Sequence, residues 1–110
     1  MNRLKTVYDA IDEKKGEGIS VLDIKELTAF SDYFVIATAD NMTQLGAIVD
    51  NVEEKMIELY NERPKSIEGD KTSNWILMDY RDFVVHIFTR ESRPFYDLDR
   101  IWKEGKEISF

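Results

Sequence analysis

Two short apolar runs, Trp75–Met78 and Phe83–Phe88, are the strongest feature of the hydrophobic pattern of this chain. Both are rich in β-branched and aromatic residues, which favours strands. The polar-edged residues 79–82 between them predict a β-hairpin. The second run shows no alternation of polar and apolar positions, so we expect it to be buried on both faces, in the middle of a covered sheet.

Helical periodicity appears twice before this hairpin. Apolar residues spaced i, i+3, i+4 and i+7 over Leu4–Ile11 predict an amphipathic helix, and we expect Gly16 and Gly18 to end it. A longer apolar stripe predicts a second helix with Asn41 as its N-cap and Pro64 as its stop. Gln44 stands three residues after that cap, at capping-box spacing.

The remaining elements are shorter. The pattern predicts strands at Ile19–Ile24 and Tyr33–Ala37, a weak edge strand at Ser66–Asp70, and a last helix that starts at Ser92 and Pro94 and docks through Leu98, Ile101 and Trp102. This order predicts an α/β fold with a mixed sheet and flanking helices. With 110 residues, we expect a single domain over residues 1–103 and a frayed tail over 104–110.

Charge and cysteine content narrow the function classes. The net charge of −7 disfavours direct contact with nucleic acid or an anionic membrane and favours a basic protein as partner. The absence of cysteine excludes disulfides and thiolate metal sites. We find neither a signal-peptide pattern nor an apolar run of the roughly 20 residues that a membrane span needs, and we therefore expect a cytoplasmic protein without a membrane contact.

Catalytic chemistry has few candidate residues. The only histidine, His86, lies inside the most apolar run, which is typical of a structural histidine. Asp32, Asp79 and Asp82 suggest the paired carboxylates with which nucleotidyltransferases hold magnesium ions. However, Asp79 and Asp82 belong to different strands and the chain has no Gly-Ser pair. We therefore expect no enzyme activity, metal or cofactor, and keep a divergent nucleotidyltransferase as the alternative.

The first run of the hairpin carries more apolar side chains than one half-covered strand needs. Trp75, Leu77 and Asp79 share one face of the strand, whereas Met78 and Tyr80 share the other. One set packs on the core, and the other meets either a helix or a partner. Trp, Tyr and Met are enriched at the centres of interfaces, so this strand is our candidate binding surface. The alternative, that both sets are core, stays open.

Several segments, in order, also match a known pattern. They are S-D-Y-F-V-I-A-T-A-D-N-M-T-Q at Ser31–Gln44, E-G at Glu68–Gly69, W-I-L-M-D-Y at Trp75–Tyr80, F-V-V-H-I-F at Phe83–Phe88 and F-Y-D-L-D-R-I-W at Phe95–Trp102. Over about residues 4 to 103, the chain resembles the ribosomal silencing factor family RsfS, also called Iojap. The resemblance implies a compact α/β domain shaped like a minimal nucleotidyltransferase without that activity.

The resemblance also implies a function. Family members bind a basic protein of the large ribosomal subunit and sterically block joining of the small subunit, which represses translation, and they are often dimeric when free. Carried over by position, the partner-binding residues are Glu68, Trp75, Met78, Asp79 and Tyr80. We expect Trp75 and Met78 to fill apolar hollows and Glu68 and Asp79 to pair with Lys or Arg. A self-associating assembly module is the second alternative.

Two positions depart from the family pattern. Glycine is usual where this chain has Arg81 in the hairpin turn and where it has Ala39 after the second strand. If the turn requires a positive φ, arginine there costs on the order of 1 kcal/mol or forces another turn type.

Overall fold

The computed structural model describes residues 2–29, 31–69, 74–91 and 104–110. Its elements are α1 (Asn2–Glu13), β1 (Glu17–Asp23), β2 (Tyr33–Ala39), α2 (Met42–Tyr60), β3 (Ser66–Glu68), β4 (Trp75–Asp79), β5 (Phe83–Thr89) and β6 (Lys106–Glu107). The predicted final helix, from Ser92 and Pro94 through Leu98, Ile101 and Trp102, lies outside the described residues. The hairpin, the edge strand and both earlier helices are confirmed.

The strands form one mixed sheet in the order β3-β4-β5-β2-β1-β6. β2 and β5 run parallel at its centre, and the other neighbouring pairs are antiparallel. This confirms the predicted α/β class. β5 is buried at six of its seven positions, as its apolar sequence predicted.

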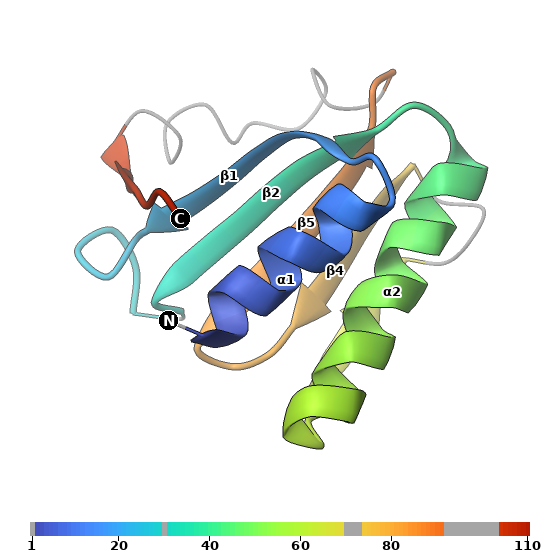
Figure 1. Cartoon of the computed structure of the whole chain (residues 1–110). Coiled ribbons are helices and arrows are strands. Elements are labelled where there is room, and N and C mark those ends of the chain that lie inside the picture. The colour runs from blue at the N-terminus through green and yellow to red at the C-terminus, as the bar shows by residue number, and fades with distance from the viewer. Residues whose placement is uncertain (1, 30, 70–73, 92–103) are drawn as a thin grey trace.

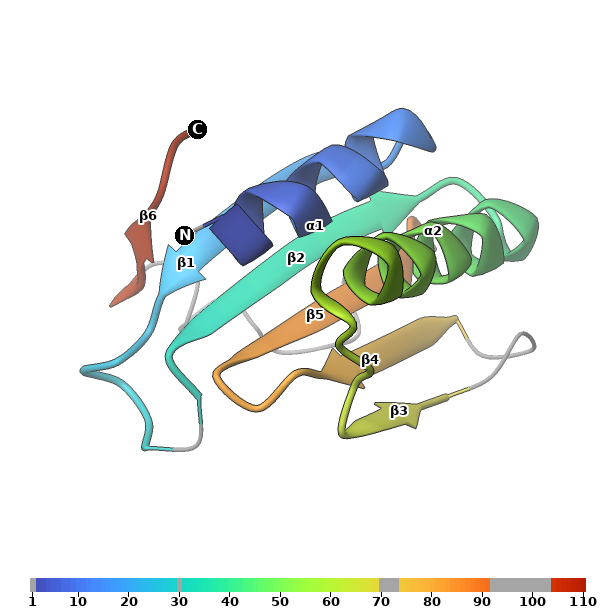
Figure 2. The same cartoon turned by 60° about the horizontal axis from the view of Figure 1, so that its bottom comes forward.

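Both helices cover the same face of the sheet. Figures 1 and 2 show α1 and α2 side by side on that face, and Figure 2 shows β3 and β6 at opposite edges of the sheet. The main core lies between these two layers. Among its fully buried side chains are Val7, Ile11, Val35, Leu45, Ile48, Val52, Met56, Met78, Val85 and Ile87.

The end of α1 differs from the prediction. Lys15, with φ 66°, takes the left-handed conformation that we expected of glycine. Gly16 has another role, because a Cβ there would lie 2.4 Å from Cγ2 of Ile11. The glycine therefore permits a close approach between the turn and the helix that it follows.

The cap of α2 ties the two helices together. Asn41 Oδ1 accepts a 2.8 Å hydrogen bond from the Gln44 backbone N–H, as the capping-box spacing predicted. The Gln44 side chain accepts from the Asp40 N–H at 2.6 Å, rather than from the N-cap residue itself. Its amide nitrogen donates to the carbonyls of Lys14 and Lys15, each at 3.0 Å. The start of α2 is thus bound to the turn after α1.

Two predicted ends are wrong. Asn61, with φ 50°, caps the C-terminus of α2 in the left-handed conformation, so the helix ends before Pro64. The expected fraying of 104–110 is not found either, because Lys106–Glu107 pairs with β1 and the Ile108 N–H donates to Val21 at 2.8 Å. The open edge of β1 offers backbone groups that such a short segment can satisfy without a strand signal of its own.

Candidate protein interface

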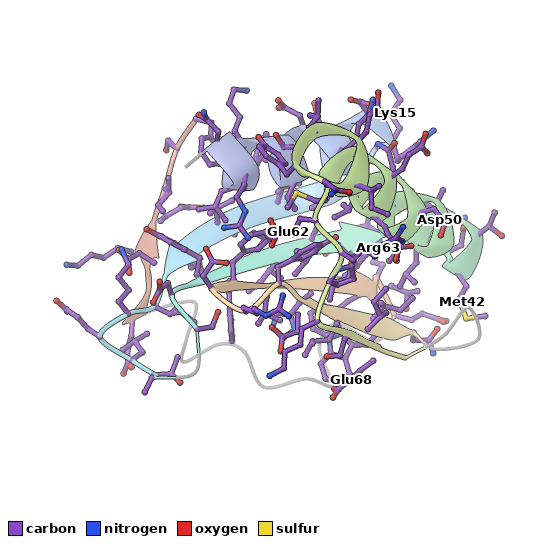
Figure 3. All side chains as sticks on the ribbon, turned by 90° about the horizontal axis from the view of Figure 1, so that it is seen from below. Lys15, Met42, Asp50, Glu62, Arg63 and Glu68 are labelled. Carbon is purple, nitrogen blue, oxygen red and sulfur yellow. The ribbon has the colours of Figure 1, made fainter. Side chains whose placement is uncertain are left out.

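Strand register brings three of the five predicted site residues onto one face. Glu68 lies opposite Leu77, and Trp75, Leu77 and Asp79 alternate along β4. Residues directly opposite each other point to the same side of a sheet, so all four share a face, which we call the outer strand face. Figure 3 shows Glu68 on the side of the sheet away from α1 and α2.

The outer strand face is partly open. Glu68 is exposed, and Trp75, Leu77 and Asp79 are half-buried. Trp75 packs against a smaller apolar cluster on this side of the sheet, formed by Leu22, Ile24, Ile36 and Phe88 with Leu27 and Phe34. The outer strand face therefore combines an aromatic side chain packed in a cluster with the carboxylates of Glu68 on the edge strand and Asp79 at the end of β4.

Met78 and Tyr80 are corrections to the predicted contacts. Each has an exposed fraction of 0% and packs in the core beneath the helices, because its strand parity is opposite to that of Trp75. The ring of Tyr80 stacks on Phe83 with centroids 5.1 Å apart, and burial raises the pKa of its hydroxyl. These two side chains support the hairpin from within and do not reach a partner in this conformation.

The hairpin turn is strained at one residue. Arg81 has φ 78°, and the Asp82 N–H donates to the Tyr80 carbonyl at 3.0 Å across it, which makes a γ-turn with a positive φ. The Asp79 carboxylate accepts from the Arg81 N–H at 2.7 Å. Arg81 thus has the backbone conformation that glycine favours. Ala39, the other departure from the family pattern, is buried at the end of β2 and has no positive φ.

Asp82, which the sequence offered as a candidate metal ligand, is held in an ion pair within the fold. Arg3 donates to its carboxylate at 2.7 and 3.0 Å and to that of Glu62 at 2.8 and 2.5 Å. Burial alone would raise the pKa of Asp82, but the hydrogen bond and charge of Arg3 outweigh it and lower that pKa. Within the described ranges, no three His, Cys, Asp or Glu side chains gather closely enough to hold a metal ion.

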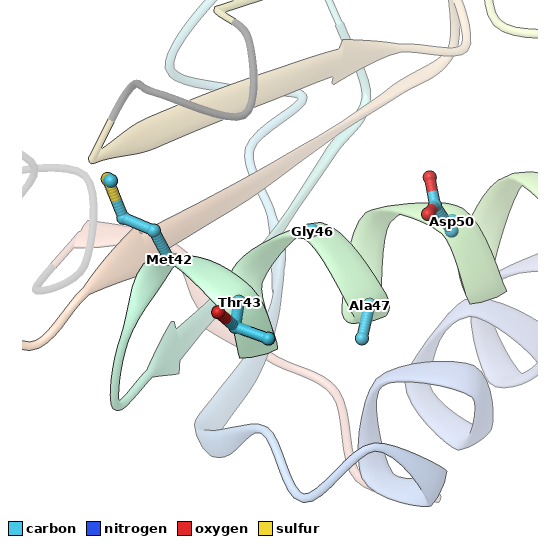
Figure 4. Close-up of a pocket in the computed structure, with 5 residues that line it drawn as sticks. All are labelled: Met42, Thr43, Gly46, Ala47 and Asp50. Carbon is cyan, nitrogen blue, oxygen red and sulfur yellow. The ribbon is translucent and has the colours of Figure 1, made fainter.

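Among the hollows formed by the described residues, two that were not predicted involve the start of α2. One, of about 470 Å³, runs along α2 over Met42, Thr43, Gly46, Ala47 and Asp50 (Figure 4). The other, of about 580 Å³, is lined by Asp40, Asn41, Met42, Thr43, Asn74, Thr89, Arg90 and Glu91. The adjacent small residues Gly46 and Ala47 are the feature of the sequence that could have indicated the first hollow.

Neither hollow offers a free cationic group. Arg90, in the second hollow, is held by Asp40 at 2.7 Å and by Glu17, so its charge is neutralised there. The first hollow is lined by residues of one helix and carries only the Asp50 carboxylate. In the described part of the chain, no helix combines the length and apolar character that crossing a bilayer requires.

Comparisons with known proteins agree with this fold. The family model described as "Ribosomal silencing factor during starvation" matches residues 1–110. Ribosomal silencing factor RsfS of Bacillus subtilis is 32% identical over 102 residues, covering 93% of this chain and 86% of that protein. The protein of the same name from Halalkalibacterium halodurans is 29% identical over 105 residues, covering 96% and 89%. A crystal structure of a Chromobacterium violaceum protein superposes with a TM-score of 0.86 at 30% identity, covering 99% of this chain and 89% of that one.

Proposed function

Because this chain belongs to the ribosomal silencing factor RsfS family, we propose that it binds a basic protein of the large ribosomal subunit through the outer strand face. The bound chain occupies space that the small subunit needs, so it blocks subunit joining and represses translation. The observation that carries this proposal is the half-buried Trp75 flanked on the same face by Glu68 and Asp79.

Charge supports a basic partner. Among the described residues, neither Glu68 nor Asp79 is in an ion pair, whereas Glu62 and Asp82 are both held by Arg3. Carboxylates that have no ion-pair partner in the described part of the chain and that lie beside an apolar anchor can pair with Lys or Arg side chains of a partner. Trp75 and Leu77 supply the desolvated centre in which binding energy concentrates.

The proposed mechanism is steric and involves no reaction. Two of the three candidate aspartates have structural roles, because Asp82 is neutralised by Arg3 and Asp79 accepts a hydrogen bond that closes the hairpin turn. The alternative of a divergent nucleotidyltransferase makes a different prediction, since magnesium with nucleotide would raise the melting temperature by mass action. We expect no such shift.

Co-sedimentation with isolated large subunits, followed by addition of small subunits, tests the proposal. The chain is expected to sediment with large subunits and to reduce the fraction of joined particles. The double variant Glu68→Gln and Asp79→Asn should bind roughly tenfold more weakly, because it removes both charges while the Asn oxygen still accepts from Arg81. The control Glu54→Gln removes an exposed charge on α2 and should bind as the unaltered chain does. Equal binding by the double variant and the control would contradict the proposed surface.

A homodimer is the expected state of the free protein. β3 is an edge strand of three exposed residues, and Ile67 within it is 38% exposed. Such an edge can pair with a second copy. Sedimentation velocity at several concentrations, with and without large subunits, separates a dimer that competes with the subunit from a protein that only self-associates. We place this activity in the cytoplasm, where an acidic protein would meet its basic ribosomal partner.

A further inference from the structure

Trp75 is joined to the only histidine of the chain. The indole nitrogen Nε1 of Trp75 lies 3.3 Å from Nδ1 of His86 and donates to it. The two rings are almost parallel, at 3°, with centroids 6.0 Å apart. His86 is 5% exposed, so this contact is made in a largely dry part of the sheet.

The direction of this hydrogen bond determines where the imidazole carries its proton. An indole N–H is a donor only, so Nδ1 of His86 must present a lone pair to it. A doubly protonated imidazole would turn Nδ1 into a donor and place two N–H groups against each other. The imidazole is therefore neutral, with its single proton on Nε2.

Among the described residues, two apolar rings also lie beside His86. Phe34 lies with its ring centroid 4.6 Å away, and Phe88 lies 6.1 Å away and nearly parallel to the imidazole. Nε2 is buried and has no hydrogen-bond partner among the described residues. A buried donor without a partner is a cost that a phenylalanine or leucine at this position would avoid. Histidine offers an acceptor to the Trp75 indole, which phenylalanine and leucine lack, and this hydrogen bond can offset the cost.

We infer that His86 is a positioning residue for Trp75: its Nδ1 accepts the indole N–H and holds the indole in the orientation that the ribosomal partner meets. The second half of this inference rests on the proposed function. A side chain fixed before binding loses less rotamer freedom when it binds, so the hydrogen bond raises affinity without His86 touching the partner.

The first test uses the unaltered protein. Because the chain has one histidine, ¹⁵N labelling of histidine gives one pair of imidazole nitrogen signals. At neutral pH, Nδ1 should resonate as an unprotonated nitrogen and Nε2 as a protonated one. A coupling across the hydrogen bond between Trp75 Nε1 and His86 Nδ1 is also expected. A proton on Nδ1, or rapid averaging between the two tautomers, would overturn the inference.

The second test is a double-mutant cycle on binding to large subunits. His86→Phe keeps an aromatic ring but removes the acceptor, and it should weaken binding roughly 5- to 20-fold. Trp75→Phe should weaken binding at least as much, and the double variant no further, because His86 acts through the indole. His86→Asn, whose side-chain oxygen can take the place of Nδ1, should recover part of the loss.

The outcomes separate this inference from the proposed function. Additive losses in the cycle would show that His86 acts independently of Trp75, and would overturn the positioning role. If Trp75→Phe binds as the unaltered chain does, the outer strand face is not the partner surface. The imidazole signals then still decide whether His86 holds the indole.

Discussion

The carboxylate of Asp79 accepts a hydrogen bond from the backbone N–H of Arg81, and it thereby closes a turn in which Arg81 has φ 78°. A residue proposed to face the partner thus also shapes the hairpin tip. Replacing Asp79 by a basic residue would change charge and turn together. An Asn at this position changes only the charge, because its side-chain oxygen can still accept.

The same turn predicts a stabilising substitution. Arg81→Gly should raise the free energy of unfolding by about 1 kcal/mol, because glycine adopts a positive φ without the steric cost that arginine bears. Arg81→Ala is the matched control, since it removes the side chain but keeps the strained backbone, and it should show no gain. Urea denaturation measures both. A gain of equal size in the two variants would mean that the side chain, not the φ angle, is unfavourable.

Two glycines should respond to alanine in opposite ways. At Gly69, φ is 89° and a Cβ would lie 2.5 Å from the Trp75 carbonyl oxygen, so Gly69→Ala should destabilise the protein by roughly 2 kcal/mol or more. At Gly46, within α2, a Cβ would meet no atom within 4 Å, so Gly46→Ala should stabilise by up to about 1 kcal/mol. Thermal unfolding of the two variants measures whether each substitution lowers or raises the melting temperature. A stabilising Gly69→Ala would refute the close approach of Gly69, the residue after β3, to the Trp75 carbonyl in β4.

Arg3 should be a larger contributor than an ordinary surface cation. Its guanidinium joins α1 to Glu62 after α2 and to Asp82 in the hairpin turn, in both cases through two hydrogen bonds. Arg3→Lys keeps the charge but loses this fork, and we expect a loss of about 1 kcal/mol after allowance for its partial exposure. Lys5→Met, which removes the exposed pair with Asp9, should cost less than about 0.5 kcal/mol. Equal losses in the two variants would contradict the linking role.

Stability should fall on mild acidification through His86. Burial lowers the pKa of its imidazole from 6.5 to about 4, so the unfolded chain binds a proton in this window before the folded chain does. The stabilisation is complete above pH 6.5 and decreases as the pH falls towards 4. Between pH 7 and pH 5 this amounts to roughly 2 kcal/mol. Between pH 7 and pH 5, the free energy of unfolding of His86→Phe, measured by urea titration, should therefore fall by about 2 kcal/mol less than that of the unaltered chain. Equal decreases in the two proteins would refute the shifted pKa of His86.

Local rules were sufficient for most of the fold. Apolar runs with a polar break placed the hairpin, and cap spacing placed the start of α2 at Asn41. They did not identify β6, because its two charged residues carry no strand signal. These residues pair with β1 because β1 leaves an open edge. They also did not identify Lys15 or Asn61 as left-handed residues, because glycine and proline nearby gave the stronger signal.

The candidate site was predictable in part for a different reason. Strand parity separates Trp75 and Asp79 from Met78, but it does not say which set the helices cover. That choice depends on where α1 and α2 pack, which is a tertiary property. The contact between Trp75 and His86 also depends on register, since His86 lies opposite Leu77 and reaches Trp75 only across the diagonal. The sequence therefore predicts a structural histidine at position 86 but does not identify Trp75 as its partner.

The side-chain amide of Gln44 bears on how this molecule opens. It satisfies carbonyls at the end of one helix while its oxygen accepts a backbone N–H at the start of the other. Neither helix terminus can fray without exposing groups that belong to the other, so the pair should behave as one cooperative unit in native-state hydrogen exchange. The helical layer formed by α1 and α2 would then unfold in a single step, without a state in which only one of the two helices is open.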